Sequence, residues 1–511
     1  MRRVLLAASC VLMLAPSLTG AQGRTTAQRA APLEPFRPRF HFTPERNWMN
    51  DPNGMVYYDG EWHLFYQYNP FGDKWGHMSW GHAVSRDLVH WEQLPLALAE
   101  SDGVMIFSGS AVVDWRNTSG FARDGKPPLV ALYTGHRDGH QDQRIAYSND
   151  RGRTWSKGGV VLDLNKADFR DPKVFWHAPS SRWVMTVALS PEYKVQFYTS
   201  PDLKRWTRSG EFGPAGSRGG IWECPDLFPV QVEGGGTRWV LIVNLNPGAP
   251  AGGSGTQYFV GDFDGQRFVP DGEVAQPLWA DYGADFYAGV SWSDVPAADG
   301  RRVWLGWMSN WSYAQEVPTS PWRSAMSVAR TLTLRRTPAG LRLVQRPVAE
   351  LERLRRGVPR TFAGGTFTQA SAWLAAQRDL PMLLDVEMTF AGASSAAPFA
   401  LQLTTGPAES LALSIDPANR RIALDRTRSG RVAFHKDFPG VHTAPIRIAN
   451  GEIQLRLLID AASLELFAQQ GETVMTEIFF PTGDSRALSL SATGTTPRVQ
   501  QIRIHGLDSA R

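Results

Sequence analysis

The sequence Ser85-Arg-Asp-Leu-Val-His-Trp91 recurs along the first half of the chain and decides the fold. It returns as Ser-Asn-Asp150-Arg-Gly-Arg-Thr-Trp155, as Ser-Pro-Asp202-Leu-Lys-Arg-Trp206 and, more weakly, as Asp264-Gly-Gln-Arg-Phe268. Each copy follows a strand-like run and ends on an aromatic residue, so we interpret its aspartate as a turn residue. A strand-built repeat of roughly 50–60 residues is typical of the blades of a β-propeller.

Strand-like segments surround this repeat and predict an all-β fold. From residue 38 to residue 345, aromatic and β-branched residues alternate with polar ones, and Gly, Asp, Asn and Pro punctuate them. Five pairs of apolar strands can be placed there, which predicts a five-bladed β-propeller over 38–345. The alternation continues over 358–511 without the repeat, which predicts a C-terminal β-sandwich. We interpret the charged stretch 346–357 as a linker with helical character.

The first residues have the pattern of a secretory signal peptide. Two arginines precede an apolar run from Val4 to Pro16, and small residues follow it. We therefore expect a signal peptide over 1–21, a flexible lead-in over 22–37, and secretion to the periplasm or the medium. A membrane anchor is the alternative, but the apolar run is too short to cross a bilayer.

Composition narrows the class of protein. Of 511 residues, 42% are hydrophobic and 20% are charged, as in soluble globular proteins. No dense Lys/Arg stripe indicates a nucleic-acid partner, and no metal-ligand cluster or phosphate loop indicates a metal or cofactor. His77 and His82 fall on opposite faces of a strand, which disfavours a shared metal. Cys224, the one cysteine outside the signal, lacks the sequence context of a catalytic thiol. The oligomeric state stays open.

Three motifs place a carboxylate beside a proline. They are Trp48-Met-Asn-Asp51-Pro-Asn-Gly, Phe-Arg170-Asp171-Pro and Trp-Glu223-Cys-Pro-Asp. One such dipeptide alone usually marks a turn, but three in register with a repeat indicate loops that converge on one pocket. Aligning the prolines puts Asn50, Arg170 and Glu223 in one position, and Asp51, Asp171 and Cys224 in the next.

This acidic set has the chemistry that glycoside hydrolysis requires, namely one ionised and one protonated carboxyl group. Amide donors around Asp51 are expected to lower its pKa, which suits a nucleophile. Glu223 lies between Trp222 and Cys224, an apolar setting that disfavours its charge and suits a general acid. Arg170 is expected to keep Asp171 ionised. Trp48 is among the aromatic residues near these loops that could stack on a sugar ring.

At these residues the chain resembles glycoside hydrolase family 32, the invertase, inulinase and levanase family. Further matching stretches are Phe107-Ser-Gly-Ser, Asp-Phe-Tyr287-Ala and Ile459-Asp-Ala-Ala-Ser-Leu-Glu-Leu-Phe467. The resemblance implies a five-bladed propeller joined to a sandwich, and hydrolysis with retention. It implies that Asp51 is the nucleophile, Glu223 the acid/base and Asp171 the transition-state stabiliser. The implied contacts to the terminal fructose are Asn50, Gln67, Trp75, Phe107, Ser108, Arg170, Tyr287 and Trp307.

The subtype stretches resemble bacterial exo-acting fructanases, so we expect hydrolysis of terminal fructosyl residues from levan or inulin, with sucrose as a side substrate. Three alternatives remain open. A fructosyltransferase would use the same residues with a sugar as acceptor, an invertase would prefer sucrose, and a binding protein would have lost catalysis. The preference for β-2,1 or β-2,6 linkages depends on residues beyond the terminal sugar.

Overall fold

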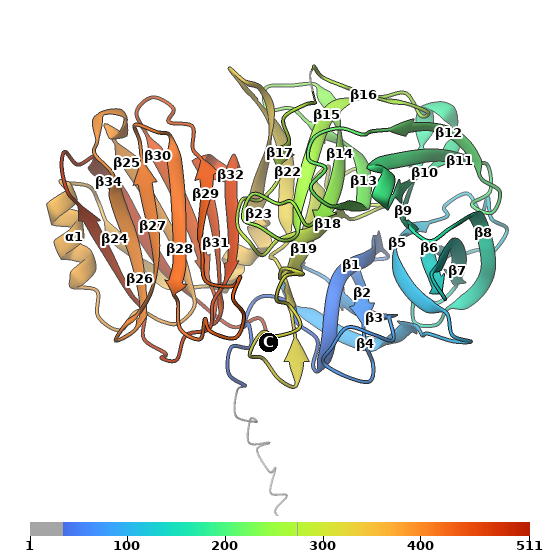
Figure 1. Cartoon of the computed structure of the whole chain (residues 1–511), viewed down its shortest axis with the longest axis horizontal. Helices are drawn as coiled ribbons and strands as arrows, with labels where there is room; N and C mark the ends of the chain where they lie inside the picture. Colours follow the sequence, from blue (N-terminus) through green and yellow to red (C-terminus); the bar gives the residue numbers. More distant parts are fainter. Residues whose placement is uncertain (1–33, 273) are drawn as a thin grey trace, which may run out of the picture. The chain divides into compact units, whose positions relative to one another are not determined.

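The structure is a computed structural model that describes residues 34–272 and 274–511. Figure 1 shows two bodies of strands within this part of the chain, one built from the strands up to residue 347 and one from those that begin at residue 355. The predicted signal peptide over 1–21 and most of the predicted lead-in lie outside the described residues. No helix among the described residues has both the length and the apolar character needed to span a bilayer.

The strands from residue 47 to residue 347 form five antiparallel sheets, apart from one short parallel pairing of β20 with β1. The first sheet contains β1 (Asn47–Tyr58), β2 (Glu61–Tyr68), β3 (Ser79–Ser85), β4 (Trp91–Leu98) and β20 (Trp322–Arg323). The second contains β5 (Met105–Val113), β6 (Leu129–Arg137), β7 (His140–Ser148) and β8 (Ser156–Lys166). The third contains β9 (Phe169–His177), β10 (Arg182–Leu189), β11 (Lys194–Ser200) and β12 (Thr207–Phe212).

Two further sheets complete this body. The fourth contains β13 (Ile221–Gln231), β14 (Thr237–Asn246), β15 (Gly255–Phe263), β16 (Phe268–Pro270) and β17 (Leu278–Trp279). The fifth contains β18 (Tyr287–Ser291), β19 (Arg302–Met308), β21 (Ala325–Met326), β22 (Arg330–Thr337) and β23 (Gly340–Pro347). We call this body the propeller domain.

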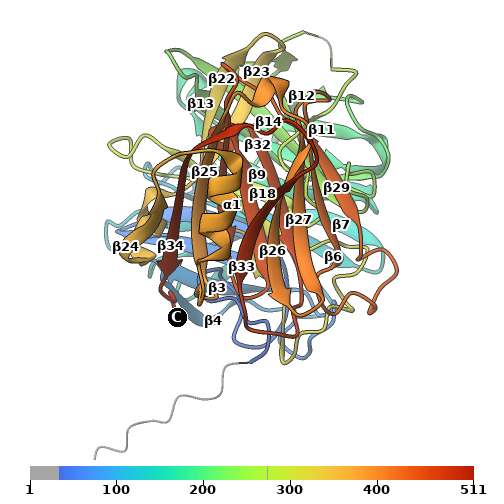
Figure 2. The same ribbon diagram turned by 90° about the vertical axis from the view of Figure 1, so that its left-hand side faces the viewer.

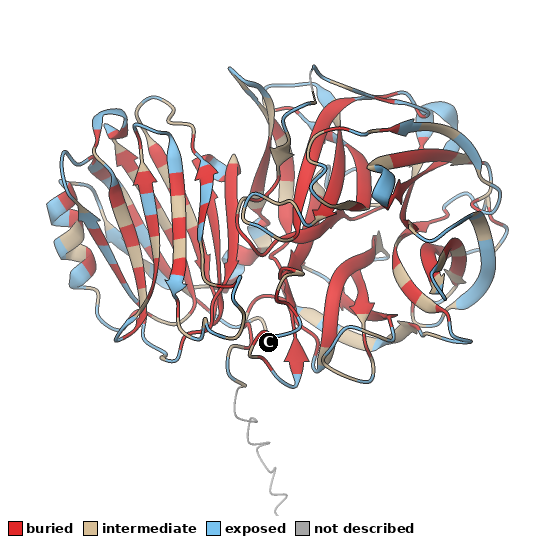
Figure 3. Cartoon of the chain, viewed as in Figure 1, coloured by how far each residue is buried: buried red, intermediate tan, exposed pale blue. Residues whose placement is uncertain are grey.

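The first strands of the five sheets, β1, β5, β9, β13 and β18, lie against one another in a closed cyclic order. Most of their residues are buried, as Figure 3 shows. A ring of buried first strands is the arrangement in which propeller blades surround an axis. Strand pairing does not itself define blades, so the count of five blades stays a prediction.

The strands from residue 355 onward form two sheets that pack face to face, which confirms the predicted sandwich. One sheet has the order β24 (Arg355–Phe362), β34 (Arg498–Leu507), β25 (Leu384–Ala391), β30 (Ile453–Ile459), β31 (Ser463–Ala468) and β32 (Thr473–Ile478). The other has the order β29 (Val441–Pro445), β28 (Arg421–Arg428), β27 (Glu409–Asp416), β26 (Phe399–Gly406) and β33 (Ala487–Ala492). Alternate residues such as Leu401, Leu403, Val386 and Met388 fill the core between them. Helix α1 (Phe367–Ala375) covers β33 and β34 (Figure 2).

The connection between the two bodies is shorter than the expected linker of 346–357. Strand β23 continues to Pro347, a 3-10 helix spans Ala349–Leu354, and β24 begins at Arg355. The charged residues at both ends of the stretch pair in sheets, because neighbouring strands satisfy their backbone groups. Only the middle of the stretch has the helical character that its sequence suggests.

The repeated aspartates hold turns, as the sequence predicts. The Asp87 carboxylate accepts hydrogen bonds from the backbone of Val89 and His90. Asp150, Asp202 and Asp264 accept equivalent backbone bonds from the residues two to four positions further on. These carboxylates accept the backbone hydrogen bonds that hold each turn, so we assign the repeated aspartates a structural role.

Reciprocal buried ion pairs join the propeller domain to the sandwich. Arg330 of β22 pairs with Glu465 of the sandwich at 2.5 Å, and Arg426 of the sandwich pairs with Asp285 of the propeller domain at 2.5 Å. His41 also contacts Glu465, at 2.8 Å. All five side chains are fully buried. Removing one member would leave an unpaired buried charge, which typically costs about 3–5 kcal/mol, so these pairs fix the two bodies together.

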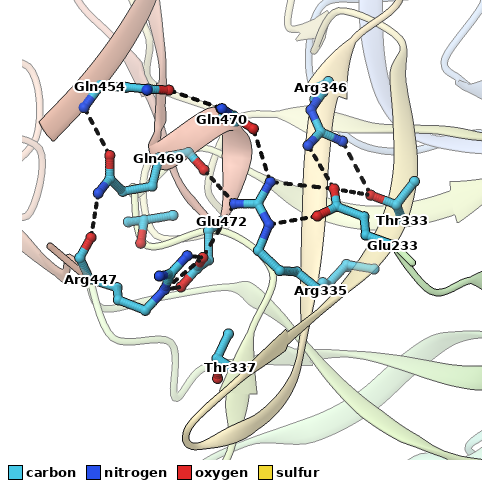
Figure 4. Close-up of polar contacts among 12 residues, drawn as sticks. Glu233, Thr333, Arg335, Thr337, Arg346, Arg447, Gln454, Gln469, Gln470 and Glu472 are labelled. Atoms are coloured by element: carbon cyan, nitrogen blue, oxygen red, sulfur yellow. Dashed lines mark hydrogen bonds and ion pairs between the residues drawn. The ribbon is translucent and has the colours of Figure 1, made fainter. Parts of the chain in front are cut away.

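A second, more exposed set of polar contacts crosses the same interface (Figure 4). Arg335 of β22 binds the Glu233 carboxylate at 2.6 Å and the Gln470 side chain at 3.1 Å. On the sandwich side, Arg447 pairs with Glu472 at 2.6 Å. The two arginines share Glu472, because Arg335 lies 3.4 Å from it. The carboxylate of Glu233 has a pKa lowered to about 2, because Arg335 and Arg346 outweigh its partial burial.

Candidate active site

A β-bulge with the same register shift interrupts all five first strands. In each one, two adjacent residues of the first strand lie opposite a single residue of the partner strand, and these two residues form the bulge. The bulged pairs are Asn50-Asp51, Phe107-Ser108, Asp171-Pro172, Cys224-Pro225 and Ala288-Gly289. A bulge bends its strand and redirects side chains, and bulges are frequent beside active sites. The sequence motifs are therefore one structural device repeated around the ring.

The bulges correct the alignment of the motifs by their prolines. Asp171 and Cys224 are the first residues of their bulges and have positive φ values of 67° and 44°. In the first sheet the corresponding residue is Asn50, whereas Asp51 is second in its bulge. The first motif is thus shifted by one residue from the predicted alignment. Asp51 and Asp171, which occupy different positions in their bulges, both contact Cys224.

The Asp51 carboxylate is held by three donors from three sheets. Its Oδ1 accepts a hydrogen bond from the Asn50 amide at 3.1 Å. Its Oδ2 accepts bonds from the Ser108 hydroxyl at 2.9 Å and from the Cys224 thiol at 3.4 Å. The Trp48 indole donates to Asn50 at 2.7 Å and fixes the orientation of its amide. With 8% of its surface exposed, Asp51 is rigidly placed at the edge of solvent.

Asp171 is bound through its backbone and its carboxylate. Its backbone N–H donates to the Thr134 hydroxyl at 2.9 Å, and its Oδ2 accepts from the Cys224 backbone N–H at 2.8 Å. Cys224 therefore contacts both aspartates, Asp51 through its thiol and Asp171 through its amide. These bonds bring carboxylates that are 120 positions apart in the chain into one cluster.

Glu223 directly precedes Cys224 and has polar rather than apolar neighbours. Its Oε1 accepts a hydrogen bond from Arg170 Nε at 3.1 Å, and its Oε2 accepts a short bond from the Tyr287 hydroxyl. Its side chain is 19% exposed. The expected apolar setting is wrong, because the Glu223 carboxylate lies between the Arg170 guanidinium and the Tyr287 hydroxyl.

Burial governs the charge of the two aspartates. It raises the pKa of Asp51, the Glu223 charge raises it further, and the three side-chain donors only partly offset this. Burial also raises the pKa of Asp171 to about 7, against the lowering effect of Arg170. The predicted lowering of the Asp51 pKa and the predicted ionisation of Asp171 by Arg170 are therefore wrong in net direction. Donors lie where the sequence suggests, but desolvation is the larger effect.

The cluster holds three carboxylates and one guanidinium, that of Arg170, which also pairs with Asp168. Full ionisation would therefore leave an excess of negative charge in a buried place. Mutual repulsion favours a state in which the cluster retains a proton near neutral pH. A cluster with both an ionised and a protonated carboxyl group has the two forms that acid-assisted nucleophilic substitution requires.

The residues predicted to bind substrate fall into two groups. Asn50, Ser108, Arg170 and Tyr287 contact the carboxylates directly, as described above. The others surround the cluster or support it. The rings of Trp48 and Trp307 are fully buried, with centroids 6.1 Å apart, and the buried Gln67 side chain donates to the Ile106 carbonyl at 3.0 Å. The Phe107 ring stacks on His136 with centroids 4.6 Å apart, and the ring of Trp75, which is 39% exposed, lies 6.1 Å from it.

Two of these outer residues have groups available to a ligand. Trp75 presents an exposed aromatic surface at the rim. The Trp307 indole N–H has no hydrogen-bond partner within the described part of the chain, although the ring is fully buried. A buried donor without a partner is unfavourable and is a group that a bound hydroxyl could satisfy.

The sequence analysis did not identify the side chains that contact Asp171 and Arg170 from neighbouring positions. Thr134 on β6 holds Asp171, and Gln141 on β7 lies 3.3 Å from Arg170. Asp168 pairs with Arg170 at 2.7 Å. Asp168 stands two residues before Arg170 and could have been inferred from that spacing. Thr134 and Gln141 come from second and third strands without a motif, so no sequence signal marks them.

Family models match nearly the whole described chain. The model described as the glycosyl hydrolases family 32 N-terminal domain matches residues 41–347, and the family 32 C-terminal model matches residues 350–506. The chain belongs to glycosyl hydrolase family 32. Solved members of this family have an N-terminal β-propeller and a C-terminal β-sandwich, which agrees with the two bodies described here.

Individual relatives in family 32 cover almost the same residues. A levanase of Bacillus subtilis (strain 168) is 48% identical over 97% of this chain and 74% of its own length. An extracellular exo-inulinase of Aspergillus ficuum is 40% identical over 93% of this chain and 95% of its own length. The crystal structure of an exo-inulinase from Aspergillus awamori superposes with a TM-score of 0.86 at 38% identity, covering 94% of this chain and 99% of that one.

A further solved member of family 32 contains a ligand. The β-fructofuranosidase from Schwanniomyces occidentalis, complexed with fructosyl-erythritol, is 34% identical and has a TM-score of 0.81. It covers 92% of this chain and 98% of that one. The likeness to these structures therefore extends across both bodies of the chain.

Proposed function

We propose that this chain is an exo-acting fructan β-fructosidase. It would hydrolyse terminal β-D-fructofuranosyl residues of levan- and inulin-type fructans, and sucrose as well, with retention of configuration. The observation that carries the proposal is the contact of Cys224 with both Asp51 and Asp171, next to Glu223, which gathers three carboxylates in one place. The levanase and exo-inulinase relatives supply the substrate class.

In the first half of the proposed reaction, the Asp51 carboxylate attacks C2 of the terminal fructosyl residue. The bond from C2 to the leaving oxygen breaks, and Glu223 passes its proton to that oxygen. The Ser108 and Asn50 donors hold the attacking carboxylate in one orientation, which is the form of preorganisation that lowers the barrier without reorganisation during the step.

In the second half, Glu223 accepts a proton from a water molecule while the water oxygen bonds to C2 and the bond from C2 to Asp51 breaks. The contacts of Glu223 with Arg170 and Tyr287 stabilise its ionised form at this stage. Two inversions at C2 give net retention. Asp171 binds hydroxyl groups of the fructosyl residue, and these bonds strengthen as positive charge develops at C2.

The proposal is tested by the products from levan, inulin and sucrose. Purified protein is expected to release free fructose from the start of each reaction, with no early short oligosaccharides. Asp51→Ala protein, prepared identically, is expected to release none. Oligosaccharides without free fructose would exclude exo action, and growth of longer chains from concentrated sucrose would instead identify a fructosyltransferase.

Secretion is proposed on similar grounds. The exo-inulinase relative is described as extracellular, and the sequence before residue 22 has the pattern of a signal peptide. Expression of the full chain with its first residues intact should give protein that begins near residue 22 outside the cytoplasm. Protein that keeps Met1 in the cytoplasm would contradict this.

A further inference from the structure

A pocket lies at the far ends of the strands that build the active site. It is a cavity of about 360 Å³, within the usual size range of small-molecule sites. Lys173 follows Asp171 by two positions, Asp226 follows Glu223 by three, and Ser291 follows Tyr287 by four. We call this cavity the rear pocket. It shares four first strands with the active site, β5, β9, β13 and β18, but none of the active-site residues described above.

Four residues of the rear pocket carry buried polar atoms that no other group satisfies. Over residues 34–272 and 274–511, no hydrogen-bond partner exists for Asp226 Oδ1, Ser291 Oγ, Arg302 Nε or Trp176 Nε1. Asp226 and Ser291 are 0% exposed. Buried polar atoms normally have partners, so four orphans around one cavity indicate a place built for a polar occupant. Together they offer one acceptor, two N–H donors and one hydroxyl that can do either.

The fixed charges around the rear pocket cancel. Lys173 lies 3.4 Å from Asp226 and donates a short bond to the Ser291 carbonyl. Arg302 adds a second cation and Asp294 a second carboxylate, which accepts from the Val113 N–H at 2.8 Å and has its pKa raised to about 6 by burial. Two cations beside two acidic groups give no net attraction for a phosphate or a metal ion. The electrostatics therefore favour a neutral ligand.

Aromatic rings form much of the remaining wall. They are Phe175, Trp176, Trp183, Phe228 and Trp239. Arg116 covers the ring of Trp176 at 4.8 Å, and Phe175 packs on Trp239 at 5.7 Å. Aromatic faces beside a few polar groups of fixed direction match the alternating C–H faces and hydroxyl edges of a sugar ring.

We propose that the rear pocket binds one neutral hexose or polyol, separately from the active site. Free fructose is the first candidate, because the proposed hydrolysis releases it at every turnover; only this choice rests on the proposed function. Because both sites lie on the same first strands, a ligand in the rear pocket would stabilise the ends of these strands that lie away from the carboxylates.

Soaked crystals test the location of binding. Wild-type crystals exposed to fructose, glucose or mannitol are expected to show a sugar or polyol in the rear pocket that hydrogen-bonds to Asp226 and Arg302. Ordered water alone in all three soaks would overturn the proposal. Occupancy by fructose in the active site but not in the rear pocket would overturn it too, while leaving the proposed function intact.

Equilibrium dialysis with labelled fructose tests binding in solution. Ala178 is exposed and lines the rear pocket, so Ala178→Trp should fill its mouth without disturbing the core. Arg182→Trp adds the same ring to the same hairpin, at an exposed residue outside the pocket wall, and is the matched control. We expect roughly millimolar affinity, as for other small polar ligands, with two fructose molecules per wild-type or Arg182→Trp chain and one per Ala178→Trp chain. Equal numbers for all three proteins would contradict the proposal.

Discussion

Replacing Asp171 by Asn should make the protein more stable at neutral pH while slowing the reaction. Burial raises the pKa of Asp171 from 3.8 to about 7. Well below pH 4 the carboxyl group is protonated in both the folded and the unfolded chain. As the pH rises from 4 to 7, the unfolded chain releases this proton first, so the folded state loses stability from this group. The loss is complete once the pH exceeds the folded pKa of about 7.

The size of the effect follows from the pKa difference. A rise of about three units at 1.36 kcal/mol per unit corresponds to about 4 kcal/mol. Asn cannot ionise and can still accept the hydrogen bond that the Cys224 N–H donates to Asp171 Oδ2. The free energy of unfolding of Asp171→Asn, relative to wild type, should therefore rise by about 4 kcal/mol between pH 4 and pH 8. Turnover should fall roughly 10- to 100-fold, because a hydrogen bond to a charged group is lost from the transition state.

Denaturant unfolding at several pH values measures this difference. Asp262→Asn is the control, because Asp262 is an exposed carboxylate paired with Arg238. It removes the same formal charge without releasing a buried one, so its effect should stay below about 1 kcal/mol at every pH. A difference between Asp171→Asn and wild type that does not change from pH 4 to pH 8 would refute the reasoning about burial.

Glu223→Ala should lose nearly all turnover of natural fructans. With a fructosyl donor whose leaving group needs no proton, added azide should speed its turnover and give β-fructosyl azide by NMR; an α product would contradict a retaining mechanism. Burial lowers the pKa of His41, but its two carboxylate partners outweigh burial and raise the pKa from 6.5 to about 9. The protonated imidazole therefore makes its full contribution to stability below about pH 6.5, and this contribution is lost as the pH rises through 9. The advantage of wild type over His41→Gln in free energy of unfolding should therefore shrink by about 3 kcal/mol between pH 6 and pH 10, and an unchanged advantage would refute the assigned pKa. Burial raises the pKa of the Cys224 thiol well above 9, so maleimide should label it only after unfolding, as mass spectrometry of the native and denatured protein would show.

Local sequence signals predicted what depends on neighbours in the chain. The aspartates at 87, 150, 202 and 264 hold their turns through bonds to residues only a few positions away, so their repeat was enough to identify them. The three acidic motifs were likewise visible, because each bulge needs its own short pattern of residues around a proline or glycine.

Features that depend on register across sheets could not be predicted in the same way. The phase of the bulge in β1 differs by one residue from that in β9 and β13, and the proline alignment missed this. The pKa of Asp51 depends on how deeply three sheets bury it, which its neighbours Asn50 and Asn53 do not reveal. Thr134 lies on the second strand of its sheet, and only the packing of that sheet beside β9 brings its hydroxyl to Asp171.

The ion pairs between the two bodies are a further example. Arg330 and Glu465 are separated by 135 positions, and no pattern in the sequence links them. Their burial is nevertheless what positions the sandwich beside the propeller domain. An alternating strand pattern predicts that each body exists, but the contacts between bodies follow from packing alone.

The most direct test of the central claim is to trap the proposed covalent intermediate. Glu223→Ala protein is mixed with a fructosyl donor whose leaving group needs no proton, quenched in acid, and digested for mass spectrometry. We expect one added fructosyl residue on the peptide that contains Asp51, because without the acid/base group its hydrolysis is slow. A fructosyl residue attached to any other side chain would contradict the assignment of Asp51 as nucleophile.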